Sequence, residues 1–147
     1  MALEELYREV ILDHYRNPRN RVPLEQPEFQ AEGVNPLCGD EVTVELRFED
    51  GEVREVSVRG HGCSISQSSG SMMGEAIKGL TRQDVADLAS RFQTMLMSEE
   101  EHQDPHLSDP EPGSVMGELE ALQGVRRYPV RIKCASLPWT TLVQAIA

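Results

Sequence analysis

The sequence predicts a single α+β domain over residues 1–147, with a small three-stranded antiparallel sheet and helices packed mainly on one face. Two observations lead to this class. Apolar and polar residues alternate on both sides of an Asp-Gly pair, and apolar residues recur at helical spacing before and after that region. A chain of 147 residues is long enough to bury a sizeable core without disulfides.

The first expected element is an amphipathic helix, because apolar side chains follow helical spacing from Leu3 to Tyr15. Asn17-Pro18 ends the pattern, since proline cannot continue a helix. Residues 18–30 contain several prolines and little periodicity. We therefore expect an extended connector between this helix and the sheet.

The sheet is predicted from residues that alternate between apolar and polar. Residues 42–48 form one strand, Glu49-Asp50-Gly51-Glu52 forms a hairpin turn, and residues 53–60 return. The step from Val53 to Val56 breaks the alternation, so we expect a β-bulge near the turn. A shorter strand over residues 29–34 completes the sheet of three.

Two helices are expected after Cys63. The first carries an apolar face and ends near Gly79, and Thr81 caps the second, with Asp84 three residues later. The apolar faces are formed by Met72, Met73, Ala76, Ile77 and Leu80 in the first helix, and by Val85, Leu88, Ala89, Phe92 and Leu96 in the second.

The last third of the chain is predicted to hold a loop and two helices. Residues 98–113 are acidic and contain prolines, which is typical of a mobile surface loop. We expect a short helix over residues 114–123, ended by Gly124. A C-terminal helix should follow, with Ser136 as its N-cap and Pro138 in its first turn.

Charge and hydropathy restrict the function. The net charge of −11 argues against a nucleic-acid partner, whose phosphates require a basic surface. There is no apolar run long enough for a membrane span, and no signal peptide is visible. The odd cysteine count excludes a fully paired set of internal disulfides, so we expect a cytoplasmic protein with free thiols.

The three cysteines are Cys38, Cys63 and Cys134, and each is expected at the boundary of an element. Cys63 and Cys134 precede predicted helix starts, where the helix dipole stabilises a thiolate. Cys38 lies on a turn, two residues before Asp40. Three thiols and one carboxylate are a complete tetrahedral ligand set for Zn²⁺. The wide spacing is no zinc signature by itself, so three other interpretations of the cysteines stay open. They are small buried side chains, ligands of a structural zinc site, or a catalytic nucleophile.

The four histidines are weaker candidates. His61 is the one near a cysteine in the sequence, and it can face away from the site on its strand. His102 and His106 lie in the acidic loop, and His14 lies in the first helix. Lys133 and Arg131 either offset the negative charge of a Cys₃Asp site or form a solvated basic pair.

The chain resembles the IscU/SufU (NifU N-terminal-like) family of iron–sulfur cluster assembly proteins, and within it the SufU type. The resemblance rests on residues 6–20 (LYREVILDHYRNPRN), 35–40 (NPLCGD), 60–69 (GHGCSISQSS) and 130–137 (VRIKCASL). It implies that Cys38, Asp40, Cys63 and Cys134 gather at one end of the domain. There they hold Zn²⁺ or a transient [2Fe–2S] cluster bound by the three cysteines.

The same resemblance implies a sulfur-transfer role rather than a stand-alone enzyme. The partner is a pyridoxal-phosphate cysteine desulfurase, and Cys38 accepts its persulfide sulfur while the other three residues hold the metal. A partner residue such as a histidine would replace Cys38 at the metal. The sulfur or the cluster then passes to recipient apo-proteins or downstream assembly machinery.

Two departures favour the zinc-dependent sulfur acceptor over the scaffold on which a [2Fe–2S] cluster is built. The IscU-type scaffold branch has a histidine directly before the third cysteine, where this chain has Lys133. Its chaperone-recognition stretch is reduced here to Tyr128-Pro129-Val130-Arg131, which argues against a dedicated Hsp70-type partner. The acidic insertion over residues 98–113 is also a feature of the SufU type. The scaffold remains the alternative.

Overall fold

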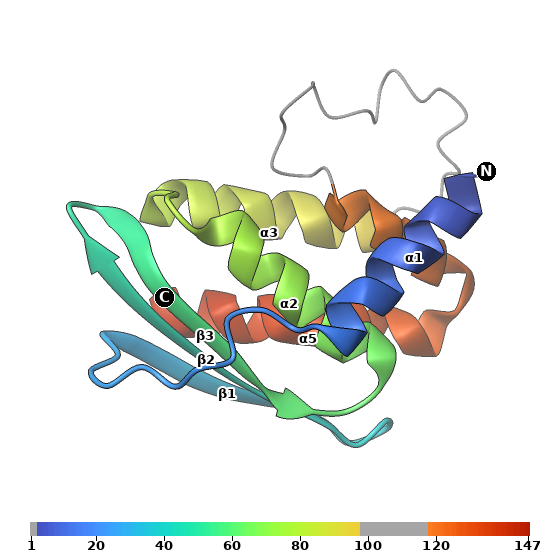
Figure 1. The fold of residues 1–147 in the computed structure, drawn as a ribbon, viewed down its shortest axis with the longest axis horizontal. Helices are drawn as coiled ribbons and strands as arrows, with labels where there is room; N and C mark the ends of the chain where they lie inside the picture. Colours follow the sequence, from blue (N-terminus) through green and yellow to red (C-terminus); the bar gives the residue numbers. More distant parts are fainter. Residues whose placement is uncertain (1–2, 98–117) are drawn as a thin grey trace.

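A computed structural model describes residues 3–97 and 118–147 of the chain (Figure 1). The elements are α1 (Leu3–Arg16), β1 (Phe29–Asn35), β2 (Asp40–Glu49), β3 (Glu52–His61), α2 (Ser64–Ile77), α3 (Arg82–Met97), the 3-10 helix η1 (Glu118–Arg127) and α5 (Pro129–Ile146). The acidic loop predicted over residues 98–113 lies outside the described residues.

The predicted three-stranded antiparallel sheet is confirmed, with the strand order β1-β2-β3. The bulge is also confirmed, because Arg47 pairs with Glu55 while Phe48 pairs with Val53. At the opposite end of the hairpin, Asn35 pairs with Asp40 and Glu41 pairs with His61. The turn that carries Cys38 and the loop that leads to Cys63 therefore leave the sheet side by side.

The helices cover one face of the sheet, as expected (Figure 1). Helix α5 packs on β1 and β2, and α2 packs on β3 and α5. Trp139 of α5 stacks on Phe92 of α3 with 4.5 Å between ring centroids, and both side chains are fully buried. Helix α5 therefore lies between the sheet and α3 in the core.

The connector after α1 passes the free edge of β3 beside α2 and then crosses to the other face of the sheet. Its Asn20 carbonyl accepts the N–H of Val58 at 2.7 Å, and the N–H of Leu24 donates to Oε1 of Glu45 at 3.1 Å. Glu45 is buried and also pairs with Arg59 at 2.8 Å. A buried carboxylate needs such partners, so this segment is extended but pinned.

Helix α5 begins eight residues earlier than predicted, at Pro129 rather than after Ser136. Proline is well suited to the first helical position, because its φ is fixed and no partner is needed there for the missing N–H. Pro138 consequently lies inside the helix instead of in its first turn. The expectation that Cys134 precedes a helix start is therefore wrong: Cys134 lies in the second turn.

Smaller differences concern the helix ends. Helix α2 ends at Ile77, and Gly79 follows with φ of +82°, which is a left-handed conformation that glycine adopts without strain. Thr81 caps α3 as predicted, since its Oγ1 accepts the N–H of Asp84 at 3.1 Å. Gly124 does not end a helix, because η1 continues to Arg127. Among the described residues, no helix has the length and apolar character needed to cross a membrane.

Candidate metal centre

Cys38 lies on the turn that joins β1 to β2. The N–H of Cys38 donates to the carbonyl of Asn35 at 3.3 Å, and Gly39 has φ of +70°, which closes the turn. The Cys38 side chain is half-buried, whereas the preceding Leu37 is 70 % exposed. The turn thus presents a thiol at the surface of the domain.

Asp40 is the first residue of β2 and is fully buried. Its Oδ1 accepts the main-chain N–H of Cys63 at 2.8 Å and the hydroxyl of Ser66 at 3.2 Å. Burial alone would raise the pKa of Asp40. The hydrogen bonds, first that from the Cys63 N–H and then those from Cys134 and Ser66, outweigh it and lower this pKa. The carboxyl is therefore ionised at neutral pH.

Cys63 is the N-cap of α2, with φ of −71° and ψ of 167°. Its Sγ lies 4.0 Å from Oδ2 of Asp40. The preceding Gly62 has φ of +154°, and a Cβ at that position would collide with Oδ1 of Asp40. A glycine is required here because the loop passes directly over the carboxylate.

Cys134 reaches the site from the second turn of α5 and is fully buried. Its Sγ lies 3.3 Å from Sγ of Cys38, and it also approaches the carbonyl of Val130 at 3.7 Å. Burial above all, followed by hydrogen bonds with Cys38, Asp40 and Cys63, raises the pKa of the Cys134 thiol. A divalent cation at this place would reverse that effect, because metal ions bind the thiolate form.

The donor atoms fit a tetrahedral metal ion. Sγ of Cys38, a carboxylate oxygen of Asp40 and Sγ of Cys134 all lie within 4.8 Å of one another. Ligands of a tetrahedral Zn²⁺ with Zn–S distances of ~2.3 Å lie roughly 3.8 Å apart. Cys63, whose Sγ is 4.0 Å from Asp40, is placed to be the fourth donor. The structure thus groups three of the four predicted residues as mutually close donors and places Cys63 next to Asp40.

The thiols affect the pKa of one nearby basic residue. Hydrogen bonding to Cys134, with the charge of Cys63 next, raises the pKa of Arg131. Arg131 is itself exposed, so whether it offsets the charge of the site or is solvated stays a prediction. Lys133 is exposed.

The described histidines do not reach the site. The side chain of His61 is 73 % exposed and pairs with Glu41. His14 is buried between α1 and α2, where Nδ1 hydrogen bonds to Oγ of Ser71 at 2.8 Å and Nε2 lies 3.3 Å from Glu118. His102 and His106 lie outside the described residues.

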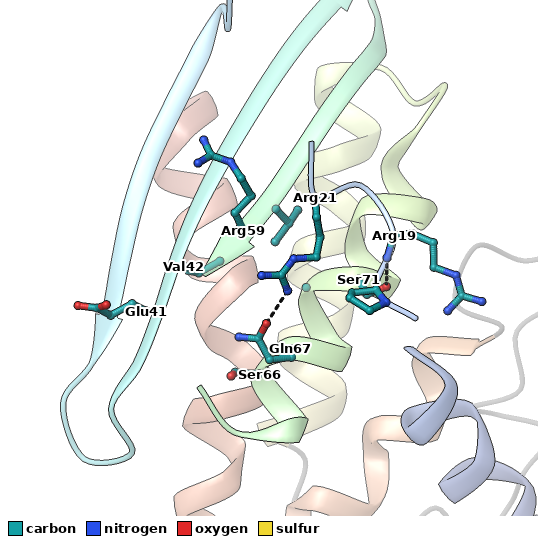
Figure 2. Close-up of a pocket in the computed structure, with 11 residues that line it drawn as sticks. Arg19, Arg21, Glu41, Val42, Arg59, Ser66, Gln67 and Ser71 are labelled. Carbon is teal, nitrogen blue, oxygen red and sulfur yellow. Dashed lines mark hydrogen bonds between the residues drawn. The ribbon is translucent and has the colours of Figure 1, made fainter. Parts of the chain in front are cut away.

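Arg21 of the connector links the end of β3 to α2, and Figure 2 shows its bond to Gln67 of α2. Its guanidinium donates to the Gly60 carbonyl at 2.8 Å and to Oε1 of Gln67 at 2.7 Å. A small cavity of about 10 Å³ lies beside it, between the connector, β3 and α2. The sequence analysis did not identify Arg21, because nothing in the local pattern of residues 18–30 indicates contacts with Gly60 and Gln67.

Comparisons with known proteins agree with this geometry. Residues 6–135 match the family described as NifU-like N terminal domain. The chain belongs to this family. It is 38 % identical over 145 residues to the zinc-dependent sulfurtransferase SufU of Bacillus subtilis, covering 99 % of this chain and 92 % of that relative. It is 33 % identical over 144 residues to the iron–sulfur cluster assembly scaffold protein IscU of Streptococcus pyogenes, covering 98 % and 84 %.

A solved structure gives the same relationship. It is a candidate iron–sulfur cluster assembly scaffold protein for the SUF system from Fervidobacterium islandicum, which superimposes with a TM-score of 0.79 at 32 % identity. The match covers 99 % of this chain and 100 % of the other. Fold and family are thus shared along the whole length, as the sequence motifs indicated.

Proposed function

We propose that this protein is a zinc-binding sulfur acceptor that works with a pyridoxal-phosphate cysteine desulfurase in iron–sulfur cluster assembly. One observation carries the proposal: three thiols and one ionised carboxylate converge at the end of the sheet, where Cys38 lies on a surface turn. The name of the Bacillus subtilis relative, a zinc-dependent sulfurtransferase, supports the same function. Because this chemistry requires free thiols, we place the protein in the reducing cytoplasm.

The surroundings of Cys38 favour docking of a protein partner. Four large apolar side chains close to Cys38 or Cys134 in the sequence are exposed by more than half: Val34 by 60 %, Leu37 by 70 %, Tyr128 by 62 % and Val130 by 56 %. Apolar side chains at the surface beside a reactive group are typical of an interaction site. A desulfurase that covers them would bring its persulfide to Cys38.

The transfer is a thiolate exchange at sulfur. The Cys38 thiolate attacks the outer sulfur of the desulfurase persulfide, a new S–S bond forms on Cys38, and the S–S bond of the desulfurase breaks. The desulfurase cysteine leaves as a thiolate, so the transfer involves no net oxidation or reduction. Recipient apo-proteins or downstream assembly proteins then take the sulfur from Cys38.

Asp40, Cys63 and Cys134 would hold the metal together with Cys38. When bound, Zn²⁺ supplies electrostatic stabilisation of the thiolates at neutral pH and protects them from oxidation. Asp40 gives the set one hard oxygen among three soft sulfurs, which allows ligand exchange more readily than four thiolates would. Arg131 partly neutralises the site.

The test combines metal content with sulfur transfer. We expect one Zn²⁺ per chain in the protein as purified, and a large stimulation of a cysteine desulfurase that is lost in a Cys38→Ser variant. A Cys38→Ser protein that accepts sulfur at the normal rate would refute the role of Cys38. Absence of both zinc and stimulation would refute the proposal as a whole.

The alternative is a scaffold on which a [2Fe–2S] cluster is built and passed on, with Cys38, Cys63 and Cys134 as cluster ligands. The similarity to the Streptococcus pyogenes scaffold protein is the observation that favours it. Anaerobic reconstitution with iron and sulfide, followed by transfer to an apo-ferredoxin, distinguishes the two functions. Efficient transfer by protein that also lacks stoichiometric zinc would favour the scaffold.

A further inference from the structure

Asn35 is the last residue of β1, and its buried amide lies between two of the candidate ligands. The amide oxygen accepts the N–H of Leu37 at 3.3 Å, which fixes the direction in which the amide points. The amide nitrogen lies 3.4 Å from Oδ2 of Asp40 and 3.8 Å from Sγ of Cys134. An amide NH₂ has two hydrogens, so it can donate to both atoms at once.

Ser66, in the first turn of α2, contacts the other oxygen of the same carboxylate. Its hydroxyl lies 3.2 Å from Oδ1 of Asp40, where the N–H of Cys63 also donates at 2.8 Å. Both Asn35 and Ser66 are buried, at 6 % and 5 % exposure. The two oxygens of Asp40 are therefore held by different elements, Oδ2 by β1 and Oδ1 by the start of α2.

We propose that Asn35 and Ser66 are positioning residues of the metal centre. Ser66 and the main chain of Cys63 occupy Oδ1, so that Oδ2 is the oxygen left on the side of the thiols. Asn35 fixes Oδ2 relative to the sulfur of Cys134. This inference rests on the proposed function, because it assigns roles toward a metal ion held by the four donors.

The consequence is an unequal set of ligands. Asp40 and Cys134 are locked to each other by Asn35, and Asp40 is joined to Cys63 by a main-chain hydrogen bond. Cys38 is held through its own N–H and through its contact with Cys134. A set in which three ligands are braced and the fourth is on a turn allows one ligand to leave while the others keep the ion.

The test measures metal binding rather than sulfur transfer. Asn35→Ala and Ser66→Ala are compared with the wild type for Zn²⁺ affinity, by competition with a chromophoric chelator, and for the absorption spectrum of bound Co²⁺. Loss of a group that orients metal ligands typically weakens binding by ~10–100-fold. We expect a loss of this size and altered cobalt bands in both variants.

Matched controls separate positioning from folding. Gln30→Ala changes an exposed residue of the same strand as Asn35, and Ser64→Ala changes a residue in the same turn as Ser66. Both controls should keep the wild-type affinity and spectrum. Circular dichroism of the metal-free proteins shows which variants fold, and if Asn35→Ala does not, Ser66→Ala decides.

The outcomes are distinct. Folded variants that bind Zn²⁺ as tightly as the wild type, with unchanged cobalt bands, would overturn the positioning roles and leave the proposed function intact. A wild-type protein that binds neither Zn²⁺ nor Co²⁺ at stoichiometric level would overturn both. If the roles of Asn35 and Ser66 are purely structural, their variants will be less stable in the metal-free form, and the cobalt-loaded variants will keep the wild-type spectrum.

Discussion

Asp40 joins the start of β2 to the start of α2, and its removal gives a measurable loss of stability in the metal-free protein. In Asp40→Ala the N–H of Cys63 and the amide of Asn35 lose their acceptor. A buried donor left without a partner costs ~1–3 kcal/mol, and relief of the buried charge offsets part of the sum. We expect a net loss of about 2–4 kcal/mol.

Asp40→Asn should lose less. It keeps one oxygen for the N–H of Cys63, but its NH₂ then faces that of Asn35. The assay is urea unfolding in the presence of a chelator, with Glu49→Ala as the control. Glu49 is exposed at the far end of the same strand, and we expect its change to stay within ~0.5 kcal/mol.

The dependence on pH gives a second, independent check. The pKa of Asp40 is lower in the folded protein than its ordinary value, so the ionised carboxylate stabilises the fold above its unfolded pKa of ~3.9. That contribution is lost as the pH falls through the folded pKa. The difference in the free energy of unfolding between wild type and Asp40→Asn should be largest at pH 5 to 7 and decrease below about pH 4. A difference that grows on acidification, or Asp40→Ala with wild-type stability, would refute this reasoning.

Three further predictions concern other contacts. Metal-free protein treated with diamide should form a Cys38–Cys134 disulfide, because the two sulfurs are 3.3 Å apart. Peptide mass mapping after treatment with and without Zn²⁺ checks this. A disulfide to Cys63 instead would contradict the prediction. Gly62→Ala should weaken Zn²⁺ binding, measured by calorimetry, because its Cβ collides with Asp40, whereas Gly124→Ala should not, because a Cβ there meets nothing within 4 Å. Trp139→Phe should lower the free energy of unfolding in urea by ~1–3 kcal/mol, because the indole N–H of Trp139 donates to buried Ser69 at 3.1 Å. If the loss in the double variant with Ser69→Ala equals the sum of the two single losses, the two side chains are not coupled, and the prediction is wrong.

The hairpin could be predicted in detail from sequence, because its determinants are local. The alternation over residues 42–48 and the Asp50-Gly51 pair specify strand, turn and face together, and the interrupted step after Val53 indicates the bulge. Each of these signals lies within a few residues of the structure that it predicts. The cap of α3 by Thr81 belongs to the same class.

The start of α5 could not be predicted in this way, because a distant contact decides it. Pro138 cannot donate a hydrogen bond to the turn before it, so a proline at this position normally indicates a helix start. In the fold, the hydroxyl of Ser69 donates to the carbonyl of Ala135 at 2.6 Å, and the indole of Trp139 donates to the same hydroxyl. Pro138 leaves the carbonyl of Cys134 without its helical N–H donor, and α2 holds the next carbonyl, that of Ala135, so this helix is supported by contacts from outside its own sequence.

The candidate site also has residues that could be predicted from the sequence and residues that could not. Its four donor residues are found by motif, because each lies in a short stretch that resembles a known family. Asn35 and Ser66 lie in two of the same stretches, but neither is a metal-ligand type of residue, and Arg21 lies outside all of them. Their contacts depend on which elements meet at the end of the sheet. Asn35 directly before a proline and Ser66 three residues after Cys63 are the weak local signs that could have indicated them.

The revised place of Cys134 supports the proposal that Cys38 is the sulfur acceptor. A thiol that attacks a persulfide on another protein must be reachable from outside, and Cys134 is fully buried within a helix. Cys63 is partly buried, like Cys38, but its N–H is bound to Asp40 and its Sγ lies 3.9 Å from Oγ of Ser66 in the first turn of α2. Cys38 alone of the three combines a turn, partial exposure and an exposed apolar neighbour, Leu37. The thiol that is held least is the one that the chemistry requires to move.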